Sequence, residues 1–246
     1  MTYCVALKLD AGLVMLADTR TNAGVDNISR FRKMFTWEVP GERAICLMCA
    51  GSLSITQGVV TQVETAVRRA AAGEEVETIL NAESLYRVAE LVGGYMASMQ
   101  AQYREALAEH GAAGDASIII AGQRAGGAHR LFMIYSPGNF IEATEDSPYM
   151  QIGEHKYGKP ILDRVIAPET PLSRALKAVY VSMDSTLRSN LSVGMPLDLA
   201  VIRAGECRLA VYRRIEDGDG EFTDIAERWS AALRGAFGSI PDIQGI

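Results

Sequence analysis

The sequence predicts an α+β fold in which two antiparallel sheets pack face to face between two helical layers, a four-layer αββα sandwich. Alternating segments and long helical patterns follow one another as strands, two helices, strands, two helices, strands. The chain has 246 residues, of which 48% are hydrophobic, so it can bury a large core. A sheet with apolar faces must cover them with further layers. We expect a single domain over residues 1–246, with residues 224–246 as a helical extension.

The first half of the chain alternates apolar and polar residues in four segments before two long helical patterns begin. The predicted strands are residues 2–9, 13–20, 31–39 and 43–50. Asp10-Ala11-Gly12 and Pro40-Gly41 are typical of the turns that join such strands into hairpins. Apolar residues at helical spacing then predict helices over 52–72 and 83–109.

The second half repeats this order with shorter segments. The predicted strands are residues 116–122, 130–135 and 140–143, and then 197–203 and 207–214. Helical spacing predicts two helices between these groups, at 157–165 and 172–188. Residues 224–234 predict one further helix in the C-terminal extension.

Charge and hydropathy exclude several classes of partner. The formal net charge is −6 and no run of basic residues occurs, which argues against nucleic acid or an anionic membrane as the main partner. No apolar stretch approaches the roughly 20 residues of a membrane helix, and Lys8 interrupts the first apolar segment. We therefore expect a cytosolic protein.

The cysteines and histidines do not predict a metal site or a cofactor. Cys46 and Cys49 are spaced as C-x-x-C, but in a strand residues three apart point to opposite faces. We interpret these two residues, with Cys4 and Cys207, as reduced thiols in the core. The three histidines show no ligand spacing; they are His110, His129 and His155.

A threonine follows the first methionine, at the start of the first predicted strand. If Met1 is removed, Thr2 carries a nucleophilic hydroxyl and a free α-amine on the same residue. An α-amine has a pKa of about 7.7 to 8, so it is partly neutral near pH 7 and can accept the hydroxyl proton. Thr2 is therefore a candidate N-terminal nucleophile.

Two charged residues are candidates for the activation of Thr2. A three-residue loop over residues 10–12 pairs Cys4 with Asp18 and places Asp18 diagonal to Thr2, about 7 to 8 Å away at the backbone. A two-residue turn at Ala11-Gly12 would place the carboxylate on the opposite face. Lys33, from the next strand, can bridge this gap, and its charge would lower the pKa of the Thr2 amine.

Several strings resemble a known family. Thr2, Ala-Asp-Thr-Arg at 17–20, Lys33 and Ala-Gly-Ser at 50–52 resemble the proteasome-type β subunits among the N-terminal nucleophile hydrolases. More narrowly, four longer strings resemble Anbu, the bacterial ancestral β subunits. They are TNAGVD at 21–26, RKMF at 32–35, GSLSITQ at 51–57 and IGEHKYGKPILDR at 152–164.

The resemblance implies a fold and a set of site residues. It implies the sandwich of the N-terminal nucleophile hydrolases, with Thr2 as nucleophile, Asp18 and Lys33 as its activating pair, and the Gly51 amide as oxyanion donor. A glycine before a helix suits that last role, because the backbone can approach the substrate and the helix dipole favours negative charge. By family position Asn22 and Gly51 would hold the substrate backbone. Phe31, Cys49 and Leu53 would line an apolar specificity pocket, although the same residues are equally typical of plain core.

The sequence departs from the proteasomal pattern near the expected site of the amine. Glu154 stands where proteasome subunits have a serine, and the expected Asp-x-x-Ser-Gly is replaced by Asn190 with Ser192 out of place. By position Glu154, Asn190 and Ser192 are candidates for orienting the terminal amine. We expect a threonine-dependent amide hydrolase that cleaves peptides. Two alternatives stay open: a non-peptidase amidase or acyl-transfer enzyme on the same fold, and a catalytically weak or inactive scaffold protein.

We expect the chain to assemble with itself into a ring or a helical stack. The two long helices carry more apolar residues than one sheet face needs, so part of this surface is predicted to pack against neighbouring subunits. Gly93-Gly94 would allow close backbone approach there. The 224–234 helix is expected at the rim of the subunit. The sequence names neither a substrate beyond a peptide or small amide nor a regulatory ATPase.

Overall fold

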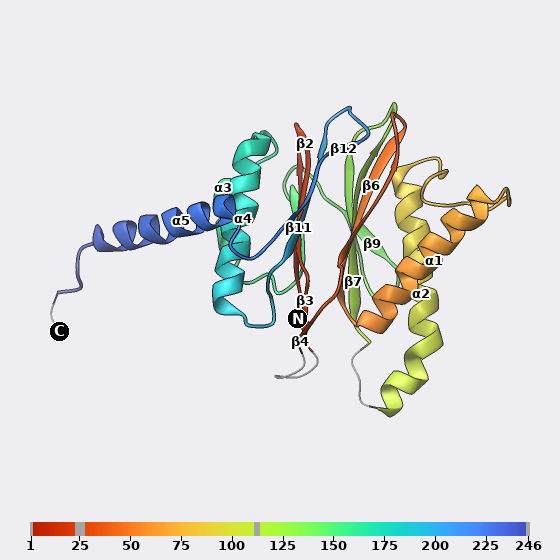
Figure 1. The fold of residues 1–246 in the computed structure, drawn as a ribbon, viewed down its shortest axis with the longest axis horizontal. Coiled ribbons are helices and arrows are strands. Elements are labelled where there is room, and N and C mark those ends of the chain that lie inside the picture. The colour runs from red at the N-terminus through yellow and green to blue at the C-terminus, as the bar shows by residue number, and fades with distance from the viewer. Residues whose placement is uncertain (1, 23–27, 111–113, 245–246) are drawn as a thin grey trace.

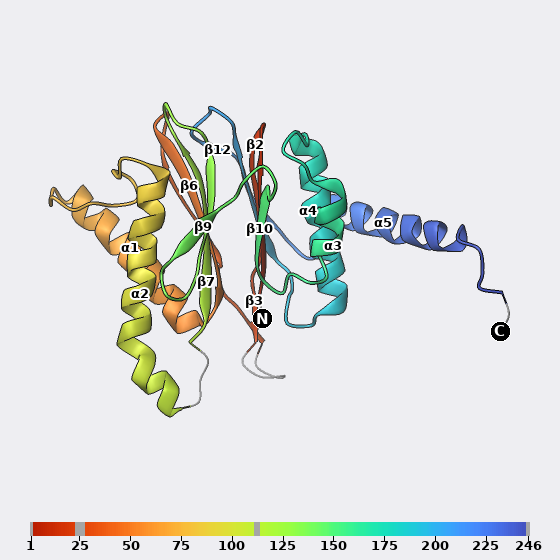
Figure 2. The same ribbon diagram turned by 180° about the vertical axis from the view of Figure 1, so that it is seen from behind.

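Two antiparallel sheets pack face to face, and helices cover the outer face of each sheet (Figure 1). The computed structural model describes residues 2–22, 28–110 and 114–244; the side chains of Asn22, Ile28 and Ala108 are not described. The reverse view shows the same order of helices, sheet, sheet and helices (Figure 2). The predicted combination of long helices with antiparallel sheets is confirmed.

The first sheet has the order β10-β1-β2-β11-β12. Two residues of the site described below belong to it: Thr2 precedes β1, and Asp18 ends β2. Its strands are β1 (Tyr3–Leu9), β2 (Gly12–Asp18), β10 (Tyr149–Gly153), β11 (Leu197–Arg203) and β12 (Leu209–Ile215). Side chains on one face of this sheet form a buried cluster with the outer helices α3 (Lys159–Val165) and α4 (Leu172–Ser189). Successive side chains along each strand point in turn to these helices and to the second sheet, so both faces of the sheet are buried.

The second sheet has the order β5-β6-β7-β8-β9. Its strands are β5 (Met34–Val39), β6 (Arg43–Gly51), β7 (Ala116–Arg124), β8 (Arg130–Ile134) and β9 (Phe140–Glu142). The outer face is covered by α1 (Leu53–Ala71) and α2 (Leu85–Glu109), while the inner face packs against the first sheet. A separate pair, β3 (Arg20–Asn22) and β4 (Ile28–Arg30), leaves the end of β2.

The last helix, α5 (Gly220–Gly238), extends away from the rest of the molecule (Figures 1 and 2). Its first turn is fixed to the body, because the Asp219 carboxylate accepts the Phe222 N–H at 3.0 Å and the Phe222 ring packs against Tyr180. The helix is longer than the predicted 224–234. No described helix has the length and hydrophobicity needed to cross a membrane.

Three strands were missed, and the predicted strand 31–39 begins three residues too early. β10, which pairs with β1, falls in the stretch between the predicted strand 140–143 and the predicted helix 157–165. The β3–β4 pair was also missed. Residues 31–33, predicted as strand, precede β5, so their side chains do not follow the alternation of that strand.

The predicted register of the opening hairpin is wrong by one residue. Leu9 pairs with Gly12 and Cys4 with Ala17, so the turn contains only two residues, Asp10 and Ala11. Gly12 has a φ of +133°, and a Cβ there would lie 2.2 Å from the Ile202 carbonyl oxygen of β11. The close approach of a third strand therefore requires this glycine, rather than a three-residue loop.

The two long helices do not have the surplus apolar surface that we expected. The expectation concerned seven apolar residues, all of which pack into one cluster with the second sheet, and Leu91 alone among these seven is only partly buried. The others are Val59, Val60, Val63, Val92, Met96 and Met99. A Cβ on Gly93 would lie 2.2 Å from the Gly138 carbonyl oxygen, so this glycine serves a contact within the chain.

Cys46 and Cys49 lie on opposite faces of β6, as predicted. Cys46 belongs to the cluster between the sheets, and Cys49 to the cluster under α1 and α2. All four cysteines are buried free thiols. Burial raises the pKa of the Cys49 thiol well above its usual range, so it is a neutral wall rather than a nucleophile.

Candidate active site

Thr2 is buried directly in front of β1, with 8% of its surface exposed. Its carbonyl accepts the Glu154 N–H at 2.6 Å, which ties it to the end of β10. Gly153 makes this approach possible: its φ is +81°, and a Cβ there would lie 1.9 Å from the Thr2 carbonyl oxygen. The glycine before Glu154 therefore fixes where Thr2 lies.

Asp18 and Lys33 form a buried ion pair beside Thr2. Lys33 Nζ donates to Asp18 Oδ1 at 2.7 Å, and the side chains are 6% and 0% exposed. The alternation of β2 turns Asp18 to the helix side of the sheet, unlike the predicted diagonal position on the Thr2 face. Asp18 instead contacts the backbone next to Thr2 at the end of β2, where the Tyr3 N–H donates to Asp18 Oδ1 at 3.0 Å. Asp18 is thus joined to the residue that follows Thr2.

The Asp18 carboxylate has more than one donor. Burial raises the pKa of Asp18, and the Lys33 ammonium and the N–H groups of Tyr3 and Gly194 act in the opposite direction. Lys33 also donates to the Arg20 carbonyl, so its ammonium is held at two points. The structure therefore confines a positive charge next to Thr2.

Gly51 ends β6 immediately before α1 and is exposed to the same space. Its φ is +97°, and a Cβ would lie 2.2 Å from the Asp115 carbonyl oxygen, so only glycine fits here without strain. The Ser52 N–H is already used by the Asp115 carbonyl at 2.8 Å. Gly51 therefore presents its backbone beside the N-terminus of a 19-residue helix, where negative charge is favoured.

These groups meet in a cavity of about 450 Å³. Of the predicted site residues, it is lined by Thr2, Lys33, Cys49, Gly51 and Leu53. Six further lining residues were not predicted: Thr21, Arg32, Phe35, Ala50, Thr56 and Gln57. Thr21, Arg32 and Phe35 lie in or next to β3 and β5, whose limits were predicted incorrectly. Ala50 lies in β6, and Thr56 and Gln57 lie in α1.

The two other predicted substrate-binding residues are Phe31 and Asn22. Phe31 is not part of the cavity wall; Phe35, four residues later in β5, is. The prediction of Phe31 came from its position in the family that the sequence resembles. Asn22 pairs through its backbone with Ile28, but its side chain lies outside the described residues. The wall combines the apolar side chains of Phe35, Cys49 and Leu53 with hydroxyl, amide and cationic groups from other residues.

The three candidate amine-orienting residues form one hydrogen-bonded chain. Asn190 Nδ2 donates to Glu154 Oε2 at 2.9 Å, and the Ser192 N–H donates to Asn190 Oδ1 at 2.9 Å. Lys156 Nζ lies 3.3 Å from Glu154 Oε1. Because the Glu154 N–H donates to the Thr2 carbonyl, this series of hydrogen bonds connects Asn190 and Ser192 to the Thr2 backbone. Elsewhere in the described chain, no three His, Cys, Asp or Glu side chains converge on a metal-sized space.

Solved structures similar to this chain cover nearly all of it. "Anbu (ancestral beta-subunit) from Yersinia bercovieri" is 40% identical over 99% of both chains, with a TM-score of 0.90. "Anbu from Hyphomicrobium sp. strain MC1" is 44% identical over 99% of this chain and 100% of its own, with a TM-score of 0.89. "Helical Assembly of the Anbu Complex from Pseudomonas aeruginosa" is 41% identical over 99% and 98%, with a TM-score of 0.91. No family model and no curated protein matches the chain.

Proposed function

The chain belongs to the Anbu (ancestral beta-subunit) family, and we propose that it is an N-terminal threonine hydrolase that cleaves peptide bonds. We also assign its layers to the αββα sandwich of the N-terminal nucleophile hydrolases. One observation carries the proposal: Thr2, Gly51 and the Lys33 of a buried Lys33–Asp18 pair border one cavity. That combination supplies a nucleophile, a fixed cation and a backbone donor at one place.

In the proposed reaction the Thr2 hydroxyl oxygen attacks the carbonyl carbon of the substrate amide. Its proton passes to the free α-amine of Thr2, and the positive charge of Lys33 favours the neutral form of that amine. The Gly51 N–H donates to the oxyanion of the tetrahedral intermediate. The C–N bond breaks as the amine of Thr2 returns the proton to the leaving group. Water then hydrolyses the ester and restores Thr2, a sequence that requires Met1 to be absent.

Covalent labelling tests this mechanism directly. A peptide epoxyketone, which reacts with a hydroxyl and a free amine on the same residue, should add once per chain at Thr2. Intact-mass measurement and peptide mapping should find the adduct only on chains that lack Met1. If the protein from its own cell keeps Met1 and takes up no label, the scaffold function is favoured. Turnover of small amides without turnover of peptides would instead favour the amidase.

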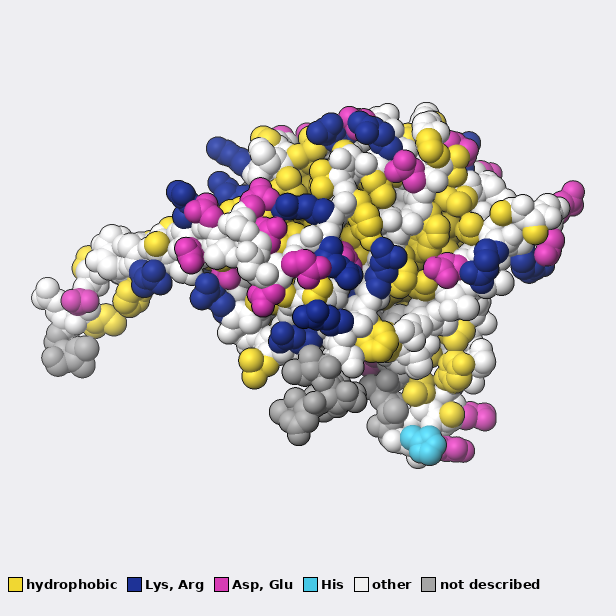
Figure 3. Space-filling model, viewed as in Figure 1, with side chains coloured by type: hydrophobic (Ala, Val, Ile, Leu, Met, Phe, Trp, Pro, Cys, Tyr) yellow, Lys and Arg dark blue, Asp and Glu magenta, His cyan; other side chains and the backbone are white. Residues whose placement is uncertain are grey.

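We propose further that the chain forms a homo-oligomer larger than a dimer. The Pseudomonas aeruginosa relative is described as a helical assembly. In the present chain, hydrophobic side chains lie on the projecting part of α5 (Figure 3). Leu233 and Phe237 on α5 are 49% and 80% exposed, and Ile240 and Ile243, which follow the helix, are 65% and 84% exposed. A solvent-exposed row of this kind is typical of a surface that a partner covers.

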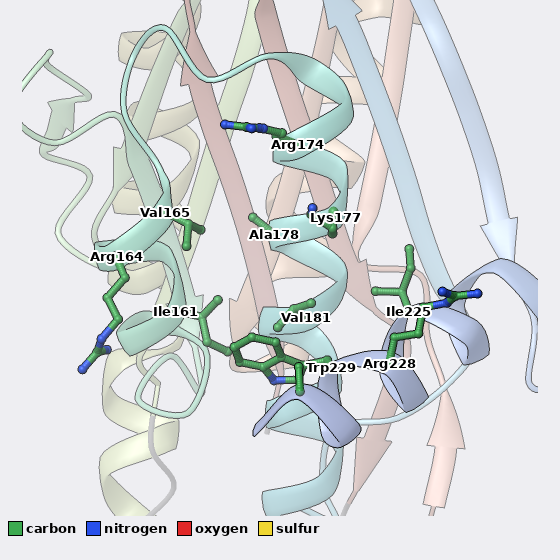
Figure 4. A pocket seen from close by; sticks show the side chains of 11 residues that line it. Ile161, Arg164, Val165, Arg174, Lys177, Ala178, Val181, Ile225, Arg228 and Trp229 are labelled. Atoms are coloured by element: carbon green, nitrogen blue, oxygen red, sulfur yellow. The ribbon is translucent and has the colours of Figure 1, made fainter. Parts of the chain in front are cut away.

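A groove next to α5 supports the same proposal. A space of about 640 Å³ lies between α3, α4 and α5, with Ile161, Val181 and Trp229 on its apolar walls (Figure 4). The Trp229 Nε1 atom is buried without a hydrogen-bond partner among the described residues. The interface is therefore proposed at α5, in place of the outer face of α1 and α2.

Phe237→Asp should lower the mass of the assembly. The aromatic side chain is 80% exposed in the single chain, so its replacement should leave the fold intact but place a charge in the proposed interface. Light scattering should give the wild type a mass well above twice 26.6 kDa and the variant a smaller one. Leu191→Asp, at an 87% exposed site away from α5, is the matched control. An unchanged mass for Phe237→Asp would remove α5 from the interface, and a monomeric wild type would contradict the assembly.

A further inference from the structure

The cavity beside Thr2 is bordered by two basic side chains, although the protein has a net charge of −6. Its described lining contains Arg32 and Lys33 and no aspartate or glutamate. Asp18, which is not part of this lining, forms an ion pair with Lys33 and neutralises its charge; Oδ1 lies 2.7 Å from Nζ. Among the described residues, no carboxylate lies within 4.0 Å of the Arg32 guanidinium. Arg32 is thus the cation that a bound substrate meets.

Arg32 is held in place by side chains from both sheets. Its guanidinium carbon lies 5.8 Å from the ring centre of Phe35 in β5 and 5.9 Å from that of Tyr212 in β12. Its Nη2 also donates to the Tyr212 hydroxyl. This bond uses one of the N–H donors of the guanidinium and leaves the others available. A fixed guanidinium with free donors is suited to a carboxylate, which it binds through two parallel hydrogen bonds.

The rest of the wall fits a short side chain that ends in a carboxylate. Cys49 and Leu53 provide an apolar surface for the carbon stem, and neither carries a charge that would oppose the acid. Gln57 and Thr21 add an amide and a hydroxyl that can donate to its oxygens. A neutral apolar side chain would bury the stem equally well but would leave these donors without a partner.

We propose that the site selects an acidic residue, with the carboxylate of the residue that precedes the cleaved bond bound by Arg32. This inference rests on the proposed function, since it assigns the substrate class of the same cavity. Arg32 acts here as a specificity-determining residue, and it takes no part in the proton transfers of Thr2.

Matched peptides test the assignment. Two capped peptides that differ only in Glu or Gln before a fluorogenic amine have the same shape and differ by one charge. The wild type should use the Glu peptide with a kcat/KM at least about tenfold higher, the scale of one charge-assisted hydrogen-bonded pair. Arg32→Gln should remove that preference, so that its kcat/KM values for the Glu and Gln peptides agree within about twofold. Arg32→Lys should retain part of the preference, because it keeps the charge but loses the paired donors.

Two controls separate the possible failures. Arg104→Gln makes the same charge change on the exposed side of α2 and should keep the preference. Equal use of the two peptides by the wild type, or an unchanged preference in Arg32→Gln, would overturn the inference. A third peptide, with Gln before the cleaved bond and a free terminal carboxylate after it, should gain nothing from Arg32. A gain there would assign Arg32 to the chain terminus of the substrate instead.

Binding provides a readout that does not need turnover. In Thr2→Ala, fluorescence anisotropy should show tighter binding of the Glu peptide than of the Gln peptide, and the difference should vanish in Thr2→Ala/Arg32→Gln. If the wild type cleaves no peptide but this binding difference is present, the proposed function fails and the acidic specificity holds. If peptides are cleaved and the difference is absent, the function holds and the specificity fails.

Discussion

Replacing Thr2 by alanine should abolish peptide hydrolysis, with a loss in kcat of at least about 10⁴-fold. When the nucleophile is removed from a group of residues that act together, kcat falls by this factor or more, because the remaining groups cannot form the covalent intermediate. The change should also prevent labelling by the epoxyketone. Steady-state kinetics on one fluorogenic peptide and intact-mass measurement check both expectations.

Thr2→Ser is the matched control for this substitution. Serine keeps the hydroxyl and the α-amine, so it should retain measurable activity, at a lower rate because its χ1 angle is less restricted than that of threonine. Neither variant should unfold the protein, because Thr2 precedes β1 and both changes remove only a few atoms. Undiminished hydrolysis by Thr2→Ala would show that another residue is the nucleophile.

The parts of the fold that repeat a simple period were predictable from the sequence. The long helices α1 and α2 and the strands of the second sheet follow apolar spacing that depends on local sequence alone. The residue types of the site were predictable for a similar reason, since Thr2, Asp18, Lys33 and Gly51 lie in short strings with a marked resemblance. Three of these four line the cavity, and Asp18 lies directly behind it.

The features that depend on distant segments were not predictable. The register of the first hairpin depends on the close approach of β11 to Gly12, and β11 lies about 190 residues further along the chain. No local signal distinguishes the two turns. β10 is short, and its place in the sheet depends on pairing with β1. Arg32 and Phe35 were missed in the cavity wall because the pocket residues were assigned by family position, and the local sequence does not show which side chains of two different sheets border one cavity.

Replacing Lys33 by methionine should lower kcat/KM by at least two orders of magnitude, about the effect of losing one electrostatic contribution in a preorganised site. Methionine is similar in length and removes the charge. The side chain is 6% exposed, so solvent does not replace the lost partner of Asp18. Lys159→Met, which breaks a half-exposed ion pair on α3, should leave activity unchanged and cost at most about 1 kcal/mol of stability.

The stability of Lys33→Met should depend on pH in a defined direction. Lys33 opposes the rise that burial imposes on the pKa of Asp18, so its loss should raise that pKa further above the unfolded value of about 3.9. A raised carboxyl pKa means that the folded variant holds a proton that the unfolded chain releases. Its stability relative to wild type should therefore fall as pH rises from 5 to 7, by up to about 1.4 kcal/mol per pH unit. Urea unfolding at several pH values measures this slope.

The double variant Asp18→Asn/Lys33→Met separates stability from catalysis. With both charges absent, no carboxylate remains to be buried alone, so the pH-dependent loss of stability should disappear. Activity should remain as low as in Lys33→Met, because the cation beside the Thr2 amine is still missing. Recovery of activity together with stability would mean that the pair only holds the fold. Normal kinetics in Lys33→Met would show that Thr2 is activated without it, even if Thr2 is the nucleophile.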